Sequence, residues 1–207
     1  MLFVLCYNNI MTNIDKTAII FIGRSGSGKG TQAKLLKDFL DQNHNSTMYM
    51  GTGNHFRDMM KDSDYTARLV KKIYDEGDRH PDFLAITMLG NIFRFEYKED
   101  QNIIIDGAAR SLHEAQVLLE ILKFYEFSNI KVIHIDVSHE WCVDKLLKRG
   151  RDDDNEKVFE IKHQWFENDV KPAIEFYRNS DKVNFIEVNG ENSIDEVYKD
   201  IIEKINE

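Results

Sequence analysis

The chain has 207 residues, 42% hydrophobic and 30% charged, which is the composition of an ordinary soluble globular protein with one sizeable core. Its 27 Lys and Arg against 36 Asp and Glu give a formal net charge of −9, which excludes a whole-surface attraction to a nucleic acid polymer or an anionic membrane. Its two cysteines, Cys6 and Cys142, exclude a disulfide framework and a four-thiolate zinc site, and predict a reducing, cytoplasmic compartment.

The N-terminal residues lack the features of a targeting segment. Met1 to Leu5 are apolar, but they have no basic leader and no small-residue cleavage site. No apolar run in the chain reaches the roughly 18 residues that a membrane-spanning helix needs, so no membrane partner is expected. Because a polar stretch follows Met11, we expect residues 1–16 to form an N-terminal extension that begins with a dispensable segment.

The first predicted element is a buried strand. Thr17 to Ile22 is short, apolar and partly β-branched, and glycines follow it, which favours a strand over a helix. From Lys29 onward the apolar residues recur at helical spacing, which predicts an amphipathic helix after a glycine-rich turn.

Strand-like runs alternate with helical stretches along the rest of the chain. This alternation predicts an α/β fold, with a parallel sheet and helices on both of its faces. Serine-x-x-glutamate pairs predict capping boxes at two helix starts, Ser111 with Glu114 and Ser193 with Glu196. The second of these helices is expected to place an apolar stripe, beginning at Ile194, on one face. The other predicted strands are 47–50, 102–105, 130–135 and 183–188.

The glycine-rich turn has the pattern of a phosphate-binding loop. Gly23 to Thr31 reads Gly-Arg-Ser-Gly-Ser-Gly-Lys-Gly-Thr, and between a strand and a helix its backbone N–H groups can surround phosphate oxygens. Lys29 supplies a positive charge, and the Thr31 hydroxyl is placed to face nucleotide-bound magnesium. The alternative, a turn that binds nothing, is disfavoured by the spacing and by the strand-to-helix context. The predicted ATP-binding residues of the loop are Ser25, Gly26, Ser27, Gly28, Lys29, Gly30 and Thr31.

One detail of the loop narrows the class of protein. Gly30 separates the lysine from the threonine, and Gly-Lys-Gly-Thr-Gln resembles the nucleoside monophosphate kinases, the adenylate kinase family above all. Three further motifs of that family follow in order, at 51–57, 106–110 and 149–155, so that the resemblance covers roughly residues 17–205. It implies a P-loop NTPase-type core in a single domain, 17–207, with a helical monophosphate-binding segment at 51–80 and a short lid at 149–156.

The family motifs contain two arginines that suit an acceptor phosphate. In the resemblance, Arg57 and Arg110 match arginines that grip the α-phosphate of the monophosphate, a bidentate task for the guanidinium fork. Taken singly, each would be interpreted as a surface ion-pair residue, but their places in two separate motifs favour binding. The resemblance places the rest of the monophosphate site at Thr52, Phe56, His80 and Gly107.

The segment after the predicted strand 102–105 departs from the family. Asp106 resembles the carboxylate that orients waters around magnesium, with a turn or helix cap as the alternative. Ala108 and Ala109 stand where the family has Phe-Pro, and because that proline fixes a tight bend, we expect the bend here to be strained or rebuilt. Asn54, in the earlier motif, replaces the usual aspartate and keeps an acceptor oxygen for local capping.

Glu114 occupies the position where adenylate kinases usually have a glutamine that reads the adenine edge. A carboxylate only accepts hydrogen bonds, so it suits the amino group of adenine or cytosine, or the N–H edge of guanine, and would repel O4 of uracil. The alternative is that Glu114 only completes the capping box with Ser111. The sequence leaves both interpretations open, and with them the choice of acceptor base.

The donor side resembles a short-lid enzyme. Lys145 and Arg149 lie one helical turn apart where the family has two arginines; Arg149 would stack on the donor adenine or meet its phosphates, and Lys145 should stack less well. Arg151 resembles a lid arginine that reaches the transferring phosphate, and Lys162 replaces a second one. Only Gly150 separates Arg149 from Arg151, which leaves no room for the larger lid, and no zinc is expected.

The resemblance implies reversible transfer of the terminal phosphoryl group of Mg-ATP to a nucleoside monophosphate, with AMP as the first choice. The alternatives are CMP or another monophosphate as the acceptor, and a non-catalytic nucleotide-binding protein. No general base is needed, because the acceptor phosphate is already anionic. The protein is expected to be a monomer whose magnesium lies near Thr31 and Asp106, held through water or the nucleotide. The predicted charge-stabilising residues are Lys29, Arg57, Arg110, Arg149, Arg151 and Lys162.

Overall fold

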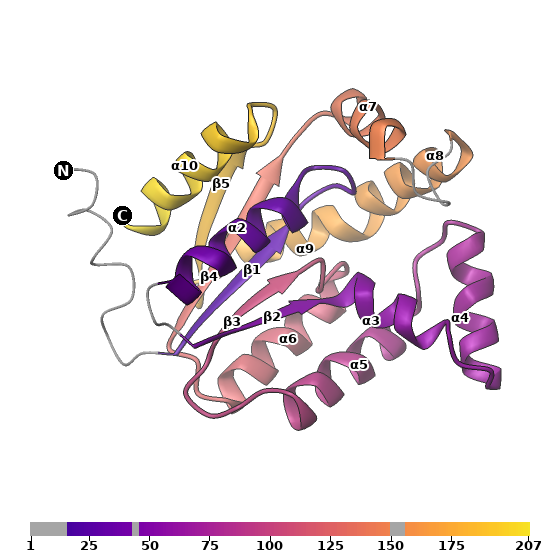
Figure 1. Ribbon diagram of the computed structural model, residues 1–207, viewed down its shortest axis with the longest axis horizontal. Helices are drawn as coiled ribbons and strands as arrows, with labels where there is room; N and C mark the ends of the chain where they lie inside the picture. Colours follow the sequence, from indigo (N-terminus) through magenta and orange to yellow (C-terminus); the bar gives the residue numbers. More distant parts are fainter. Residues whose placement is uncertain (1–15, 43–45, 150–155) are drawn as a thin grey trace.

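The computed structural model describes residues 16–42, 46–149 and 156–207, with only the backbone for Arg149 and Glu156. Residues 1–15 of the extension expected at 1–16, and the lid residue Arg151, lie outside these residues. Five parallel strands form one sheet in the order β2-β3-β1-β4-β5, which confirms the α/β prediction and the P-loop NTPase-type fold (Figure 1). The strands are β1 Thr17–Ile22, β2 Thr47–Gly51, β3 Asn102–Asp106, β4 Asn129–Asp136 and β5 Asn184–Asn189.

The central strand, β1, is buried along its whole length because helices cover both faces of the sheet. Ile19 and Phe21 pack against α2 and α10 on one face, whereas Ala18, Ile20 and Ile22 pack against α5, α6 and α9 on the other (Figure 1). The covering helices are α2 Lys29–Gln42, α5 Asp82–Phe95, α6 Leu112–Phe124, α9 Lys171–Arg178 and α10 Ile194–Ile205.

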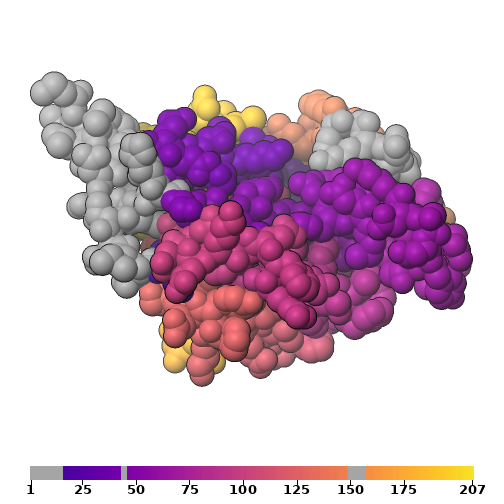
Figure 2. Space-filling model, turned by 60° about the horizontal axis from the view of Figure 1, so that its bottom comes forward, coloured from indigo at the N-terminus to yellow at the C-terminus, as the bar shows by residue number. Residues whose placement is uncertain are grey.

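The other helices lie beyond the carboxyl ends of the strands (Figure 1). Two of them, α3 and α4, follow β2 and form a lobe at one end of the molecule (Figure 2). Two more, α7 and α8, precede a π-helical turn, η2, that leads into α9. Their bounds are α3 Thr52–Met59, α4 Tyr65–Asp75, α7 His139–Arg149, α8 Glu156–Trp165 and η2 Phe166–Val170. No helix in the described ranges has the length and apolar character to cross a membrane.

The two predicted capping boxes have different outcomes. At α10 the box is complete, since the Ser193 side chain accepts from the backbone of Glu196 and the Glu196 carboxylate accepts from the backbone N–H of Ser193. At α6 only half of the box forms. Ser111 Oγ accepts from the backbone N–H of Glu114 at 3.1 Å, but the Glu114 carboxylate accepts from the backbone N–H of Arg110, one residue before Ser111, and not from Ser111 itself. The apolar stripe of α10 was expected to begin at Ile194, but this first residue of the helix is 57% exposed. The buried stripe begins at Val197, one turn later.

Candidate active site

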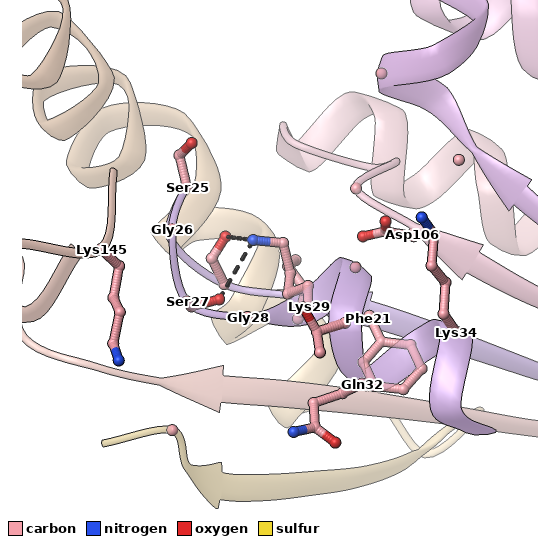
Figure 3. Close-up of a pocket in the computed structure, with 18 of the residues that line it drawn as sticks. Phe21, Ser25, Gly26, Ser27, Gly28, Lys29, Gln32, Lys34, Asp106 and Lys145 are labelled. Atoms are coloured by element: carbon pink, nitrogen blue, oxygen red, sulfur yellow. Dashed lines mark hydrogen bonds between the residues drawn. The ribbon is translucent and has the colours of Figure 1, made fainter. Parts of the chain in front are cut away.

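A cleft of about 490 Å³ opens at the carboxyl ends of the strands, where parallel α/β sheets bind ligands. Its walls come from the loop after β1, the ends of β2 and β3, helix α7 and the segment between β5 and α10 (Figure 3). The predicted site residues that line it are Ser25, Gly26, Ser27, Gly28, Lys29, Gly30, Thr31, Arg57, Asp106, Gly107, Arg110 and Lys145.

The phosphate loop requires glycine at defined positions. Gly26 has φ +91°, and a Cβ there would lie 3.0 Å from the side chain of Leu146 and 3.1 Å from the carbonyl oxygen of Cys142. Gly28 has φ +90° and no atom within 4 Å of the Cβ position, so its backbone faces open space. The turn is therefore packed against α7 at Gly26 and accessible to a ligand at Gly28.

The Lys29 side chain folds back onto its own loop (Figure 3). Its Nζ donates to the carbonyl oxygens of Gly23 and Arg24, at 2.8 and 2.5 Å. The positive charge of Lys29 is thus already held at the loop. A bound phosphate would compete with these two carbonyl oxygens for hydrogen bonds from the Lys29 ammonium group.

The π-helical turn η2 supports the phosphate loop from behind. Arg24 Nη2 donates to Glu167 Oε1 at 2.6 Å, and the Arg24 guanidinium lies 3.9 Å from the centroid of the Phe166 ring. On the other side of the cleft, the Arg110 guanidinium lies 5.8 Å from the Trp165 ring centroid. Single π-helical turns are frequent at functional sites; this one contacts Arg24 of the phosphate loop, and Trp165, the residue before it, contacts Arg110.

Asp106 ends β3 and faces the start of α2. A Cβ at Gly30 would lie 3.0 Å from Asp106 Oδ2, and the Tyr49 hydroxyl donates to that same oxygen at 2.8 Å. Burial raises the pKa of Tyr49, and the charge of Asp106 raises it further, so the hydroxyl stays protonated and donates. The carboxylate of Asp106 and the hydroxyl of Thr31 are hard oxygen ligands of the kind that Mg²⁺ takes together with nucleotide phosphates.

Within the described part of the chain, no group of three His, Cys, Asp or Glu side chains could hold a metal alone. The oxygen atoms of Asp106 and Thr31 fit a cation that brings phosphate and water ligands of its own.

The two predicted acceptor arginines share the cleft with Lys29. Arg110 Nε donates to the carbonyl oxygen of Gly107 at 2.6 Å, and Arg57 Nη2 donates to Asn54 Oδ1. Burial lowers the pKa of Arg110, and the charge of Glu114 opposes this effect, but a guanidinium remains charged at neutral pH. Three cations that are far apart in sequence thus line one cavity.

A second, smaller cavity of about 20 Å³ adjoins the cleft and contains the predicted base-binding residues. The rings of Phe56 and His80 stack in its wall, with centroids 4.1 Å apart and planes 7° apart. Thr52 Oγ1 donates to the carbonyl oxygen of Gly107 at 2.8 Å. Ala109 has φ +56°, so the bend that was expected to be strained or rebuilt holds an alanine in the left-handed region.

Glu114 is the most deeply buried charged group of this cavity, with 3% of its surface exposed. Its Oε1 accepts from Arg79 Nη1 at 2.8 Å, and its Oε2 accepts from the backbone N–H of Arg110 at 2.7 Å. Burial raises the pKa of Glu114, and the Arg110 N–H and the charge of Arg79 oppose the increase. Arg79 belongs to none of the sequence motifs, and it is not among the site residues predicted from the sequence. The one signal that could have pointed to it is that a buried carboxylate needs a cationic partner.

On the donor side, Lys145 Nζ lies 4.4 Å from the centroid of the Trp141 ring, and both residues line the cleft. Lys162 does not line the cleft; it lies in another small cavity with Arg24 and Ser25, behind the phosphate loop. Arg149 ends α7, and its side chain lies outside the description, as does all of Arg151. The structure thus brings the loop residues and Lys145 together in the cleft, and of the predicted lid cations it describes the side chain of Lys162, which lies outside the cleft.

The parallel sheet with its glycine loop, and the cations on both sides of one cleft, define a P-loop nucleotide-binding protein. The sequence matches the family described as "ADK: Adenylate kinase" over residues 21–182. It is similar to adenylate kinase 1 of Nostoc sp., at 31% identity over 186 residues that cover 89% of this chain and 96% of that protein. It is also similar to an adenylate kinase of Flavobacterium psychrophilum, at 31% identity over 198 residues and 91% and 97% coverage. A third relative is an adenylate kinase of Bacteroides thetaiotaomicron, at 28% identity over 191 residues and 90% and 97% coverage.

The chain belongs to the adenylate kinase family, as the resemblance of its motifs predicted. It is a kinase, a phosphotransferase that acts on a phosphate acceptor and moves phosphoryl groups between nucleotides. The family's substrates are ATP and a nucleoside monophosphate, which accounts for a cleft with cations on two sides.

Proposed function

We propose that the protein transfers the terminal phosphoryl group of Mg-ATP reversibly to AMP, giving two ADP. The observation that carries this proposal is that Lys29, Arg57 and Arg110 line one cavity. Phosphoryl transfer between two phosphates brings several negative charges together, and the enzyme has to neutralise and align them rather than do covalent chemistry.

Each cation has its own place in the proposed mechanism. Lys29 and the N–H groups of its loop hold the donor phosphates, while Arg57 and Arg110 hold the α-phosphate of the acceptor. The lid cations Arg149, Arg151 and Lys162 would approach the transferring group when the lid closes and excludes water. The acceptor phosphate is anionic, so no residue has to remove a proton.

Magnesium is proposed to bind with the nucleotide. Bound there, it would neutralise charge on the phosphates of ATP. Thr31 and Asp106 would hold it, directly or through water, and Tyr49 orients the Asp106 carboxylate by its hydrogen bond. This proposal uses only oxygen ligands, in keeping with the donor atoms at this end of β3.

We further propose one domain at 17–207, in which residues 51–80 bind the monophosphate and residues 149–156 form the short lid. The lining of the small cavity by residues from 52 to 80 supports the first assignment. We also propose that the protein is a cytoplasmic monomer, which the two cysteines, outside any CxxC pair, support as far as the compartment is concerned.

The test is to measure initial rates with AMP, CMP, UMP and GMP at a fixed concentration of Mg-ATP, for the native protein and for Arg110→Ala. We expect transfer to AMP, and a decrease in kcat/KM of about 100-fold or more for Arg110→Ala, since a preorganised charge is lost. The control is Arg178→Ala, which removes an arginine that pairs with Glu187 and does not line the cleft. It should leave kcat/KM within about twofold of the native value. ATP binding without transfer to any of the four monophosphates would favour the non-catalytic alternative.

A further inference from the structure

Arg79 is surrounded by acidic side chains from three separate elements. Its Nη1 donates to Asp82 Oδ1 at 2.6 Å and to Glu114 Oε1 at 2.8 Å, and its Nε lies 3.5 Å from Asp169 Oδ2. These partners come from the start of α5, from α6 and from η2. The Arg79 side chain is 18% exposed and lines the small cavity beside Phe56 and His80.

The contacts leave both members of the Arg79–Glu114 pair able to meet a ligand. A guanidinium has five N–H donors, and those of Arg79 that bond to the described residues are on Nη1 and Nε, not on Nη2. Each Glu114 oxygen accepts one hydrogen bond from the chain and has a second lone pair. The cavity wall thus presents a donor next to an acceptor, which is the pair of groups that one neutral amide side chain offers.

We propose that Arg79 and Glu114 together read the base of the monophosphate, as an ionic substitute for the glutamine that adenylate kinases usually carry at the position of Glu114. A Glu114 oxygen accepts from an exocyclic amino group, and Arg79 donates to the adjacent ring nitrogen. The base is therefore an amino base, adenine or cytosine, in which these two groups are neighbours. This inference rests on the proposed function, since it assumes that the small cavity receives the base of the acceptor.

The Glu114 carboxylate favours amino bases over keto bases. Among the described residues that line the small cavity Glu114 is the one carboxylate, whereas Asp82 and Asp169 hold Arg79 from outside this lining, so a base meets carboxylate oxygens at Glu114. An amino group directs its hydrogens to these oxygens, whereas O4 of uracil and O6 of guanine would face them with lone pairs. The arrangement therefore discriminates by repulsion as well as by attraction.

The pair also predicts how substitutions combine. Arg79→Leu leaves Glu114 buried and without its side-chain partner, and Glu114→Gln leaves Arg79 with one fewer carboxylate. The double substitution Arg79→Leu/Glu114→Gln restores a neutral amide in an apolar wall. The double variant should therefore bind an amino base better than Arg79→Leu does, which independent residues would not allow.

The experiment is a double-mutant cycle on the full chain, with AMP, CMP and UMP. Calorimetry gives the dissociation constants, and steady-state rates with Mg-ATP give KM and kcat. We expect Arg79→Leu to weaken AMP binding by about tenfold, or roughly 1.4 kcal/mol, with the KM for ATP within about twofold of the native value. The double variant should regain AMP affinity to within about threefold of the native protein. The native protein should prefer AMP or CMP over UMP.

Arg178→Leu is the matched control. It removes an arginine that is ion-paired with Glu187 at the C-terminal end of α9 and does not line the small cavity. Thermal unfolding distinguishes base recognition by Arg79 from a purely structural role. A purely structural role would lower the stability of Arg79→Leu but leave its AMP-to-UMP affinity ratio unchanged. An unchanged ratio, or a double variant no better than Arg79→Leu, would overturn the inference. Lack of transfer by the native protein would overturn the proposed function instead, while the binding ratios would still decide the role of Arg79.

Discussion

The hydroxyl of Tyr49 fixes one oxygen of the Asp106 carboxylate, at 2.8 Å. Asp106 lies next to the start of α2, whose first turn contains Gly30 and the predicted magnesium ligand Thr31. A carboxylate with one oxygen held in this way loses less rotamer entropy if it takes part in binding a cation. At this scale, the side chain that orients the ligand matters as much as the ligand itself.

Replacing Tyr49 with phenylalanine should therefore weaken the use of magnesium. We expect Tyr49→Phe to raise the magnesium concentration for half-maximal ATP binding by about tenfold, the lower end of the range for outer-shell partners of metal ligands. The KM for AMP should stay within about twofold. Tyr97→Phe, which loses a comparable bond to the Gln101 carbonyl at 2.8 Å, should cost about 1 kcal/mol of stability and leave the magnesium dependence unchanged. Equal magnesium dependence in both variants would contradict the role of Tyr49.

Residues inside sequence motifs could be predicted, and residues that act on them from elsewhere could not. Lys29, Arg57 and Arg110 belong to motifs whose spacing is local, and all three line the cleft. Tyr49 and Arg79 reach their partners across 57 and 35 positions of the chain, so no window of sequence relates them to Asp106 or Glu114. The register of β2 against β3 and the packing of α6 bring these partners together.

At the scale of elements, helix α10 depends on its first turn. The reciprocal bonds between Ser193 and Glu196 satisfy two backbone N–H groups that the helix leaves without intrahelical partners. The carbonyl of Ile194, in the same turn, accepts from Gln32 Nε2 of α2 at 2.9 Å. The cap therefore also fixes the contact between the two helices that cover one face of the sheet.

Removing the cap should destabilise the protein measurably. We expect Ser193→Ala to lower the free energy of unfolding by about 1 kcal/mol, and Ser193→Thr to retain most of it, since threonine also caps. Ser180→Ala, which removes a hydroxyl that accepts from Lys182 in a turn, is the control and should change stability by less than about 0.5 kcal/mol. Urea denaturation of the three variants gives the values. Equal losses for Ser193→Ala and Ser193→Thr would show that the hydroxyl does not cap the helix.

The strands could be predicted from the sequence because each is an apolar run that is buried between two helical layers. All five occur where expected: β1 has the expected bounds, and the other four differ from them by one residue at one or both ends. The π-helical turn Phe166–Val170 could not be predicted, because its geometry goes with contacts to Arg24 and Arg79 from distant segments. Local periodicity carries no information about such contacts.

At the scale of the molecule, the strand order separates the two halves of the cleft. The phosphate loop follows the central strand β1; β2 and β3 on one side lead to the acceptor residues Arg57 and Arg110. On the other side, β4 leads to α7 with Lys145, and β5 leads to the start of α10 at Ile194. One sheet thus carries two binding regions that meet at Lys29, as a transfer between two nucleotides requires.

The same sheet buries a histidine whose titration should affect the whole fold. His134, in β4, is 5% exposed; its Nδ1 lies 3.0 Å from Glu187 Oε2 of β5. Burial lowers the pKa of His134, and its bond to Glu187 and the charge of Asp136 oppose the decrease without cancelling it, while Arg178 adds to it. The folded protein therefore keeps the imidazole neutral at pH values where the unfolded chain takes up a proton.

Stability should for this reason decrease on acidification from about pH 6.5, the ordinary pKa of histidine, down to the lower pKa of the folded state. We expect the native protein to lose more free energy of unfolding between pH 7.5 and 5.5 than His134→Gln, by about 1.4 kcal/mol for each unit of the pKa decrease within that window. Urea denaturation at the two pH values gives this difference, in which the contributions of groups that do not interact with His134 cancel. Glu187 titrates in a lower range, since hydrogen bonds from Arg178 and His134 lower its pKa. Equal losses in the two proteins would mean that His134 is charged in the folded state or titrates there as it does in the unfolded chain.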